Sequence, residues 1–279
     1  MTIQGSSGYI SPYVGYQIIK AGDGVTLTSD IIGKFALTET DSYFISANGY
    51  LCAYSGTTDG YGWVDLGLSS GTLWATCNVG ASSPEEAGNF YAWGETKARG
   101  EEDVTNETNY ASAGSYIKNS NYWDTYKYCN GSNAFYNQSL TKYNYSETYG
   151  VVVDNVNELE EVDDAAYVNW GENWRMPSYE QIQELANNCT ITETTLNGVS
   201  GYNFVGPSGQ SIFFPVVGYY NDDPSSSGSS TTSSYYWSRV LDEQSPYAAQ
   251  CMNMVTSFNV LYGMASRCQG CSIRPVRNK

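Results

Sequence analysis

The cysteines are the residues of this chain whose chemistry stands out, because histidine is absent. Without histidine the chain lacks the usual general base, the usual serine and cysteine catalytic triads, and His-ligated zinc. Cys268 and Cys271 have the CxxC spacing of redox and zinc motifs, but no second pair stands at metal-ligand distance. We interpret them as two free thiols in a surface turn, and we predict no catalytic residue, no metal site and no cofactor.

The segment from Tyr235 to Val276 has a residue pattern that favours binding over catalysis. Its two ends look like scaffold, whereas the residues between them follow no single periodicity and share no chemistry. A catalytic site contains a few chemically complementary groups. Chemically unrelated residues between two rigid ends are instead typical of a binding surface. The alternative interpretation is an ordinary surface loop. The predicted ligand-binding residues are Arg239, Leu241, Asp242, Cys251, Asn253, Phe258, Tyr262, Met264, Cys268 and Gln269.

The scaffold of this segment has predictable anchors. Cys251 and Asn253 alternate with Met252 and Met254, as expected for a half-buried strand. Trp237, Ile273 and Val276 are predicted to hold the segment in the core. The guanidinium of Arg274 is predicted to be structural and to pair with a buried carboxylate or with carbonyls.

Two helices are predicted upstream of this segment. Residues 163–170 are predicted to form a short helix that ends at Gly171. Ser178 and Gln181 have the spacing of a capping box, followed by an apolar helical face that starts at Ile182. Ser82–Glu86 has the pattern of another helix start, with a Ser cap and acidic residues in the first turn.

Short strands account for most of the remaining pattern. Residues 63–68 and 71–76 are predicted to form a hairpin. Asn197-Gly198 and Ser208-Gly209 are predicted turns, with a short strand at 201–205 between them and another at 211–215 after the second. Many short strands with two modest helices predict an α+β fold.

The chain is predicted to have two unequal domains. Short apolar runs separated by Gly, Ser, Asp and Asn predict a small all-β module over residues 1–58. The polar stretch 55–60 is predicted to be a flexible boundary, and residues 59–279 the ligand-binding domain. One continuous domain is the alternative. Because the first unit is too small for a large core, we expect it to lean on its neighbour or on other copies, which fits an assembly role.

Composition and charge exclude several classes of partner. The formal charge of −16 argues against nucleic acid, whose phosphates need Lys and Arg, and against anionic membrane surfaces. No run approaches the length of a spanning helix, so we expect no membrane insertion. The N-terminal residues have neither a basic nor an apolar signal-peptide region. The 26 tyrosines fit a recognition protein and equally a Tyr-rich β protein. Asp222 and Asp223 are adjacent and lack the spread of oxygens that calcium requires.

Five blocks, in this order, resemble a known family. They are VDLGLSSGTLWATCNVGA (64–81), YAWGET (91–96), WGENWRMPSYEQIQEL (170–185), YYWS (235–238) and GCSIRPVR (270–277). Together they resemble the C-type-lectin-fold domains of the formylglycine-generating-enzyme branch. These include the "major paralogous" surface domains of gut bacteria and the variable proteins of diversity-generating retroelements. The resemblance covers residues 61–279 and leaves the first module unassigned.

The resemblance implies a C-type lectin-like fold whose last segment displays exposed side chains. In the retroelement members, positions there are diversified by mutagenesis at template adenines, commonly in asparagine codons. Arg239, Cys251, Phe258, Tyr262 and Cys268 fit the outcomes of such mutagenesis. Gln269 and Met264 do not fit the simplest asparagine-codon scheme.

The implied function is non-enzymatic binding of a host cell-surface protein or glycan, in a phage tail or on a cell surface. Phage receptor-binding parts are often trimers, so a homo-oligomer is expected. A bacterial surface or pilus-tip adhesin of the same fold is the first alternative. The second is a copper enzyme of the formylglycine-generating type that uses Cys268 and Cys271. Their spacing is tighter than that of the family's catalytic pair, and the surrounding pattern is missing.

Overall fold

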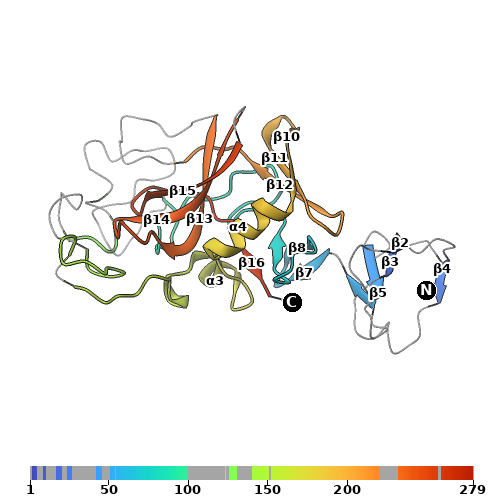
Figure 1. Ribbon diagram of the computed structural model, residues 1–279, viewed down its shortest axis with the longest axis horizontal. Helices are drawn as coiled ribbons and strands as arrows, with labels where there is room; N and C mark the ends of the chain where they lie inside the picture. The colour runs from blue at the N-terminus through green and yellow to red at the C-terminus, as the bar shows by residue number, and fades with distance from the viewer. Residues whose placement is uncertain are drawn as a thin grey trace.

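A computed structural model gives the fold (Figure 1). It describes the backbone of the short strands at 2–4, 9–10, 17–20, 24–26, 42–45 and 51–53, and then residues 55–99, 123, 126–130, 140–150, 152–219, 232–256 and 259–278.

The strands and helices lie in this order along the chain. The first strands are β1 (Thr2–Gln4), β2 (Tyr9–Ile10), β3 (Gln17–Lys20), β4 (Gly24–Thr26), β5 (Ser42–Ile45), β6 (Leu51–Ala53), β7 (Ser55–Thr58), β8 (Tyr61–Asp65) and β9 (Leu73–Ala75). The helical elements are η1 (Glu161–Asp163), α3 (Ala165–Trp170) and α4 (Tyr179–Asn188). The last strands are β10 (Thr190–Leu196), β11 (Val199–Val205), β12 (Ser211–Pro215), β13 (Ser233–Leu241), β14 (Ala248–Val255), β15 (Asn259–Ser266) and β16 (Val276–Arg277).

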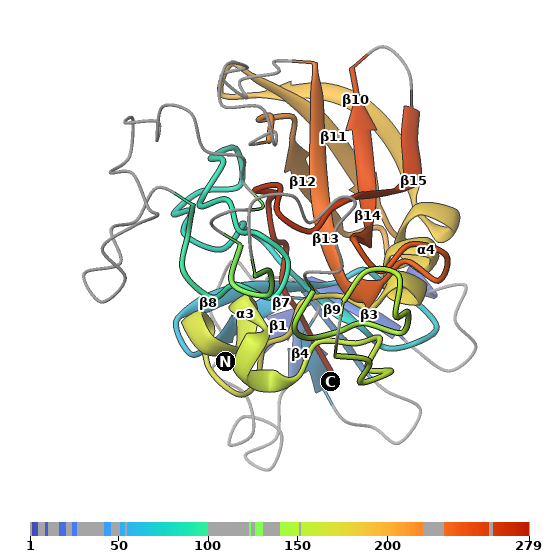
Figure 2. The same cartoon turned by 90° about the vertical axis from the view of Figure 1, so that its left-hand side faces the viewer.

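The predicted α+β class is wrong, because the chain is nearly all β. Three antiparallel sheets build the described part from Ser55 onward, in the strand orders β16-β9-β8-β7, β10-β11-β12 and β13-β14-β15 (Figure 2). The α-helices whose bounds the structure describes are α3 and α4, and neither is long and apolar enough to cross a membrane. Ser82–Glu86 forms turns instead of the predicted helix: the Glu86 carboxylate accepts hydrogen bonds from Ser82 N (2.7 Å) and Oγ (2.8 Å).

The strands before Ser55 pair only with one another among the described residues. β1 pairs with β4, and the second sheet has the order β2-β3-β5-β6. These strands lie at one end of the molecule in Figure 1. The polar stretch 55–60, however, is not a flexible boundary. It forms β7 and the turn that pairs β7 with β8, so this stretch belongs to the larger unit.

Local sequence signals correctly placed α3, α4, the β8–β9 hairpin and the turn at Asn197-Gly198, but not strand β10. Asp164 caps α3 by accepting from Ala166 N at 2.9 Å, and α3 ends at Gly171, whose φ of 102° suits glycine. The capping box of Ser178 and Gln181 opens α4 as predicted. The β8–β9 hairpin is present, and Asn197-Gly198 forms the tight turn between β10 and β11.

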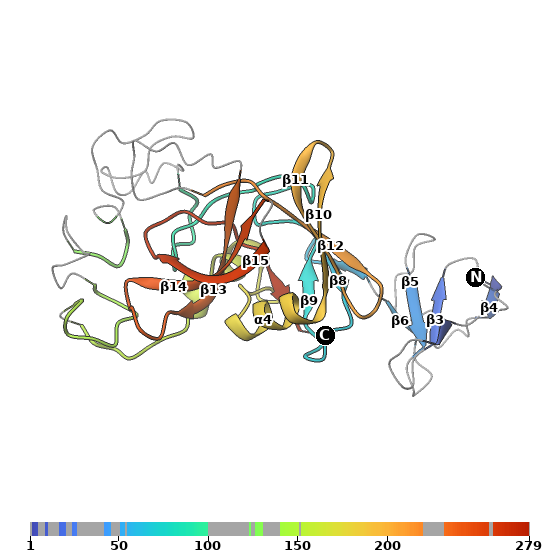
Figure 3. The same ribbon diagram turned by 45° about the horizontal axis from the view of Figure 1, so that its top comes forward.

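The strands β13, β14 and β15 form the sheet seen in Figure 3. This sheet separates two hydrophobic clusters. Trp237 lies opposite Cys251 and both belong to the first cluster, whereas Tyr236 lies opposite Met252 and both belong to the second. Ile273, also in the first cluster, is 1 % exposed. Both faces of this part of the sheet are therefore covered.

The predicted anchors of the C-terminal segment are confirmed. Trp237 and Val276, like Ile273, are buried. The Arg274 guanidinium donates to the carbonyl oxygens of Thr76 (3.1 Å) and Ala75 (3.3 Å) and to Asn78 Oδ1 (2.9 Å). Of the two predicted kinds of partner, carbonyl oxygens and not a carboxylate hold this buried arginine.

Candidate binding face

Three of the predicted ligand-binding residues are in the core, which corrects their assignment. Leu241 is 1 % exposed, and Cys251 and Cys268 are 0 % exposed. The alternation along β14 was recognised correctly, but the inference that one face meets solvent was wrong. Cys251 points into one hydrophobic cluster and Met252 into the other, so neither side chain can touch a ligand at the surface.

The CxxC pair is also buried and is not a surface turn. Cys268 and Cys271 both lie in the first hydrophobic cluster together with Cys251, and none of the three forms a disulfide. Burial, with a smaller effect of the two neighbouring cysteines, raises the pKa of the Cys271 thiol well above its usual value. Burial likewise raises the pKa of Cys251. Cys251 and Cys271 are therefore neutral thiols at pH 7 and not activated nucleophiles.

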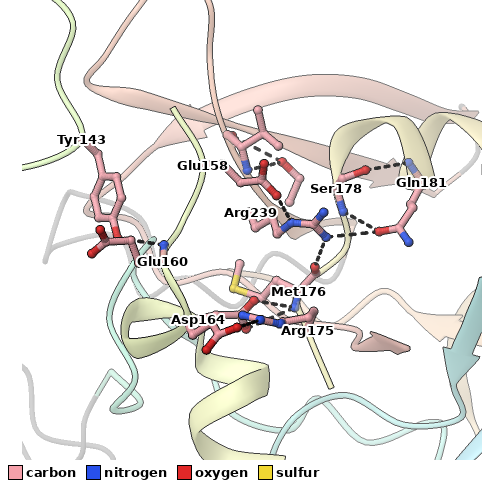
Figure 4. Close-up of polar contacts among 12 residues, drawn as sticks. Tyr143, Glu158, Glu160, Asp164, Arg175, Met176, Ser178, Gln181 and Arg239 are labelled. Atoms are coloured by element: carbon pink, nitrogen blue, oxygen red, sulfur yellow. Dashed lines mark hydrogen bonds and ion pairs between the residues drawn. The ribbon is translucent and has the colours of Figure 1, made fainter. Parts of the chain in front are cut away.

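Arg239 holds elements together and is not a freely displayed side chain (Figure 4). Its Nε forms an ion pair with Glu158, and its Nη1 donates to Met176 O at 2.9 Å and to Gln181 Oε1 at 3.3 Å. Gln181 is also the capping-box partner of Ser178, so Arg239 links β13 to the start of α4. It lines a groove of about 660 Å³ that also holds Glu161 and Arg175, where these two form another ion pair.

Asp242 and Gln269 have local structural contacts. Asp242 N donates to Ala248 O at 3.1 Å across the β13–β14 turn, and Asp242 Oδ1 accepts from Gln244 N at 3.0 Å. Gln269 Oε1 accepts from Ser266 N at 3.2 Å, directly after β15. Asn253 is half-buried. Phe258 lies outside the described residues, as do Asp222 and Asp223.

Tyr262 and Met264 are the predicted residues that the structure does place together at the surface. They are two positions apart on β15, so they point to the same side of the sheet, and they are 39 % and 51 % exposed. Among the described strands, β15 pairs only with β14, which makes it an edge strand. Tyr262 is fixed in place, because its hydroxyl donates to Asn187 Oδ1 of α4 at 2.8 Å.

Helix α4 supplies the rest of this surface, which sequence reasoning missed. Tyr179 packs edge-on against Tyr262 with ring centroids 6.1 Å apart, and Gln183 O accepts a longer hydrogen bond of 3.4 Å from the Tyr262 hydroxyl. Tyr179, Gln183 and Asn187 are spaced four residues apart, so they form one stripe along the helix. That spacing was a usable signal. We call Tyr179, Gln183, Asn187, Tyr262 and Met264 the β15–α4 face.

The C-terminal end of β15 is anchored by a buried arginine. Arg267 is 0 % exposed, and its guanidinium donates to Tyr126 Oη (2.8 Å) and to the carbonyl oxygens of Tyr143, Pro246 and Lys142 (each 3.0 Å). It also lies 5.0 Å from the centre of the Trp93 ring. The strand that carries Tyr262 and Met264 is thus fixed at its end by contacts with four separate segments.

A buried carboxylate stabilises the same region. Asp163 accepts from Tyr143 Oη (2.6 Å), Lys142 Nζ (2.6 Å) and Lys127 Nζ (2.9 Å). Burial by itself raises the pKa of Asp163, but the hydrogen bonds from Lys142 and its neighbours outweigh burial and hold this pKa well below its usual range. Because Lys142 and Tyr143 also contact Arg267, the two networks are continuous.

Chemically, the β15–α4 face offers aromatic rings, a thioether and amide groups, and it carries no ionised side chain. In the described part of the chain, no group of three or more Cys, Asp or Glu side chains is placed to hold a metal ion. No protein-family model, no curated protein and no solved structure matches this chain.

Proposed function

We propose that the chain is a non-enzymatic receptor-binding protein whose β15–α4 face recognises a protein on a host cell surface. The observation that carries the proposal is the pair Tyr262 and Met264, exposed side by side on an edge strand and backed by Tyr179. Aromatic residues and methionine are enriched in the centres of protein interfaces, and charged residues are depleted there. The face has this composition, although the chain as a whole is strongly acidic.

Rigidity supports the same proposal. The Tyr262 hydroxyl is held by Asn187, and the end of β15 is held by Arg267, so the Tyr262 side chain and its strand lose little conformational freedom on binding. Preorganisation of this kind lowers the entropic cost of association. Tyrosine adds a large contact area with few rotatable bonds.

The sequence blocks at 64–81, 91–96, 170–185, 235–238 and 270–277 add independent support, because they resemble surface and variable binding proteins. A phage tail component is the setting that this resemblance favours, with a bacterial surface adhesin as the alternative. In either setting the face would tolerate varied residues at Tyr262 and Met264, because their exposed side chains are not needed by the core.

The test is a binding measurement on intact cells. The fluorescently labelled full chain is incubated with a panel of gut-bacterial strains, and bound protein is measured by flow cytometry with unlabelled protein as competitor. We expect saturable binding to at least one strain, lost after the cells are treated with proteinase K. The double variant Tyr262→Ala, Met264→Ser should bind about 30-fold more weakly. This loss corresponds to about 2 kcal/mol of binding free energy, which is typical of an interface hot spot.

Exposed valines supply a matched control. Val162 and Val168 are 67 % and 50 % exposed on η1 and α3, away from β15 in sequence, so Val162→Ser with Val168→Ser removes a similar apolar area. This control should bind like the unmodified chain. Equal binding by both double variants would refute the assignment of the face, and binding that survives proteinase K would refute the protein partner.

A further inference from the structure

The sheet β10-β11-β12 has a second face whose chemistry is not explained by the core. Thr192, Asn203 and Phe213 are paired across the three strands, so their side chains point to the same side. The neighbouring row of Ile191, Phe204 and Ile212 points to the other side, where it packs in the second hydrophobic cluster. The first row therefore faces away from that cluster.

This outward face forms the floor of a groove of about 530 Å³. Thr76 and Pro84, from the segment after β9, line it as well. Asn197 Nδ2 donates to Glu85 Oε1 at 2.7 Å, which ties the β10–β11 turn to the residue after Pro84. The volume falls within the range of about 300–1,000 Å³ that is usual for small-molecule sites.

Four polar side chains on the sheet side of the groove have no hydrogen-bonding role within the described part of the fold, whereas the Thr76 hydroxyl donates to Gly62 O at 3.4 Å. The hydroxyls of Thr192, Thr194 and Ser211 and the amide of Asn203 line the groove, and none makes a side-chain hydrogen bond in the part of the chain that the structure describes. No charged side chain is among the described residues of the lining. For a chain with a net charge of −16, an uncharged groove of hydroxyls and an amide is a distinct local environment.

An aromatic ring completes the floor. The ring of Phe213 lies across Gly201: a Cβ built on this glycine would come within 2.5 Å of Phe213 Cζ. Gly201 therefore lets the ring lie close over the sheet backbone. Phe213 is 7 % exposed and gives the groove an apolar patch between its hydroxyl and amide groups.

We propose that this groove binds a neutral, polyhydroxylated ligand, namely a short oligosaccharide of uncharged sugars, through direct contacts that need no metal ion. Hydroxyl and amide side chains both donate and accept hydrogen bonds, which matches the hydroxyls of a sugar. Leu196, Ile212 and the edge of Phe213 add apolar lining that can contact the C–H groups of a sugar ring. The acidic chain as a whole disfavours an anionic saccharide. The site is separate from the β15–α4 face, and the inference does not depend on the function proposed for that face.

The experiment uses maltotriose, cellotriose and triacetylchitotriose as neutral probes and sialyllactose as the anionic one. Binding to the full chain is measured by saturation-transfer-difference NMR and isothermal titration calorimetry, with and without EDTA. We expect at least one neutral probe to bind, with the same Kd in EDTA, and sialyllactose to bind more weakly. Failure of all three neutral probes, or loss of binding in EDTA, would overturn the proposal.

Variants place the ligand in the groove. Thr192→Val with Thr194→Val removes two hydroxyls but keeps the β-branched shape that suits a strand. We expect the Kd for the saccharide to rise about tenfold or more, because the ligand loses hydrogen bonds to these two hydroxyls. Asn203→Ala is the second variant, and each is used only if its thermal unfolding matches that of the unmodified chain. Tyr262→Ala should leave saccharide binding unchanged. An unchanged Kd in both groove variants, or loss of binding in Tyr262→Ala, would place the ligand elsewhere.

Discussion

Replacing Arg267 by methionine should destabilise the protein far more than the loss of a surface arginine. The guanidinium is fully buried and gives four hydrogen bonds: to Tyr126 Oη and to the carbonyl oxygens of Tyr143, Pro246 and Lys142. Methionine fills a similar length but donates nothing, so four acceptors lose their donor inside the core.

The magnitude follows from those acceptors. A buried acceptor left without a donor costs about 1–3 kcal/mol, and the costs do not add fully because water enters and neighbours relax. The contact of the guanidinium with the Trp93 ring, at 5.0 Å, is lost too. We expect the free energy of unfolding to fall by about 3–5 kcal/mol. That is a large part of the total stability of about 5–15 kcal/mol that is usual for a folded domain.

Urea unfolding followed by tryptophan fluorescence measures this difference, with Arg175→Met as the control. The Arg175 side chain is 33 % exposed and pairs with a Glu161 side chain that is 57 % exposed, so its loss should cost less than about 1 kcal/mol. Arg267→Lys should fall between the two, because lysine keeps the charge but cannot reach all four acceptors. If Arg267→Met costs no more than Arg175→Met, the reasoning from buried hydrogen bonds is refuted.

Three further outcomes can be checked on the same protein. Asp163 has a depressed pKa, so its contribution to stability is complete above the unfolded-state pKa of about 4 and is lost as the pH falls below it. The stability gap between the native chain and Asp163→Asn, measured by urea unfolding from pH 6 to pH 3, should therefore narrow with acid; a constant gap would contradict the shift. Ser178→Ala removes the cap of α4 and should cost about 1 kcal/mol in thermal unfolding, whereas no loss would mean that the cap is replaced by water. The buried thiols Cys251, Cys268 and Cys271 should react with Ellman's reagent only after urea is added, and rapid reaction of any of them in the native protein, located by mass spectrometry, would contradict their burial.

Both helices on which the α+β prediction rested are present, so the class was wrong because the sheets far outweigh them; two local misreadings have a physical origin of their own. A Ser cap, a proline and two acids at Ser82–Glu86 resemble a helix start, yet no apolar stripe follows that could pack such a helix on the core. The Glu86 carboxylate instead binds Ser82 and closes a turn. Strand β7 was missed because its four residues are small and polar and give no local strand signal. They form a strand because they pair with β8.

The sequence alone was sufficient to place structural features that depend on residues close together in the chain. The Asp164 cap with Gly171, the capping box of Ser178 and Gln181, and the Asn197-Gly198 turn fix backbone groups that are close along the chain. Buried anchors such as Trp237 were also predictable, because a large aromatic side chain between strands has few places other than the core.

Only the tertiary structure decided which residues of the C-terminal segment reach the surface. Alternation along β14 shows that neighbouring side chains point to opposite sides of the sheet. It does not show that a hydrophobic cluster covers each side, with Cys251 buried in the first and Met252 in the second. Likewise, nothing local to Tyr262 reveals that Tyr179 and Asn187, on a helix about 80 positions earlier in the chain, complete its surroundings. Exposure depends on what packs against a strand from elsewhere in the chain, and that information lies in long-range contacts and not in residue spacing.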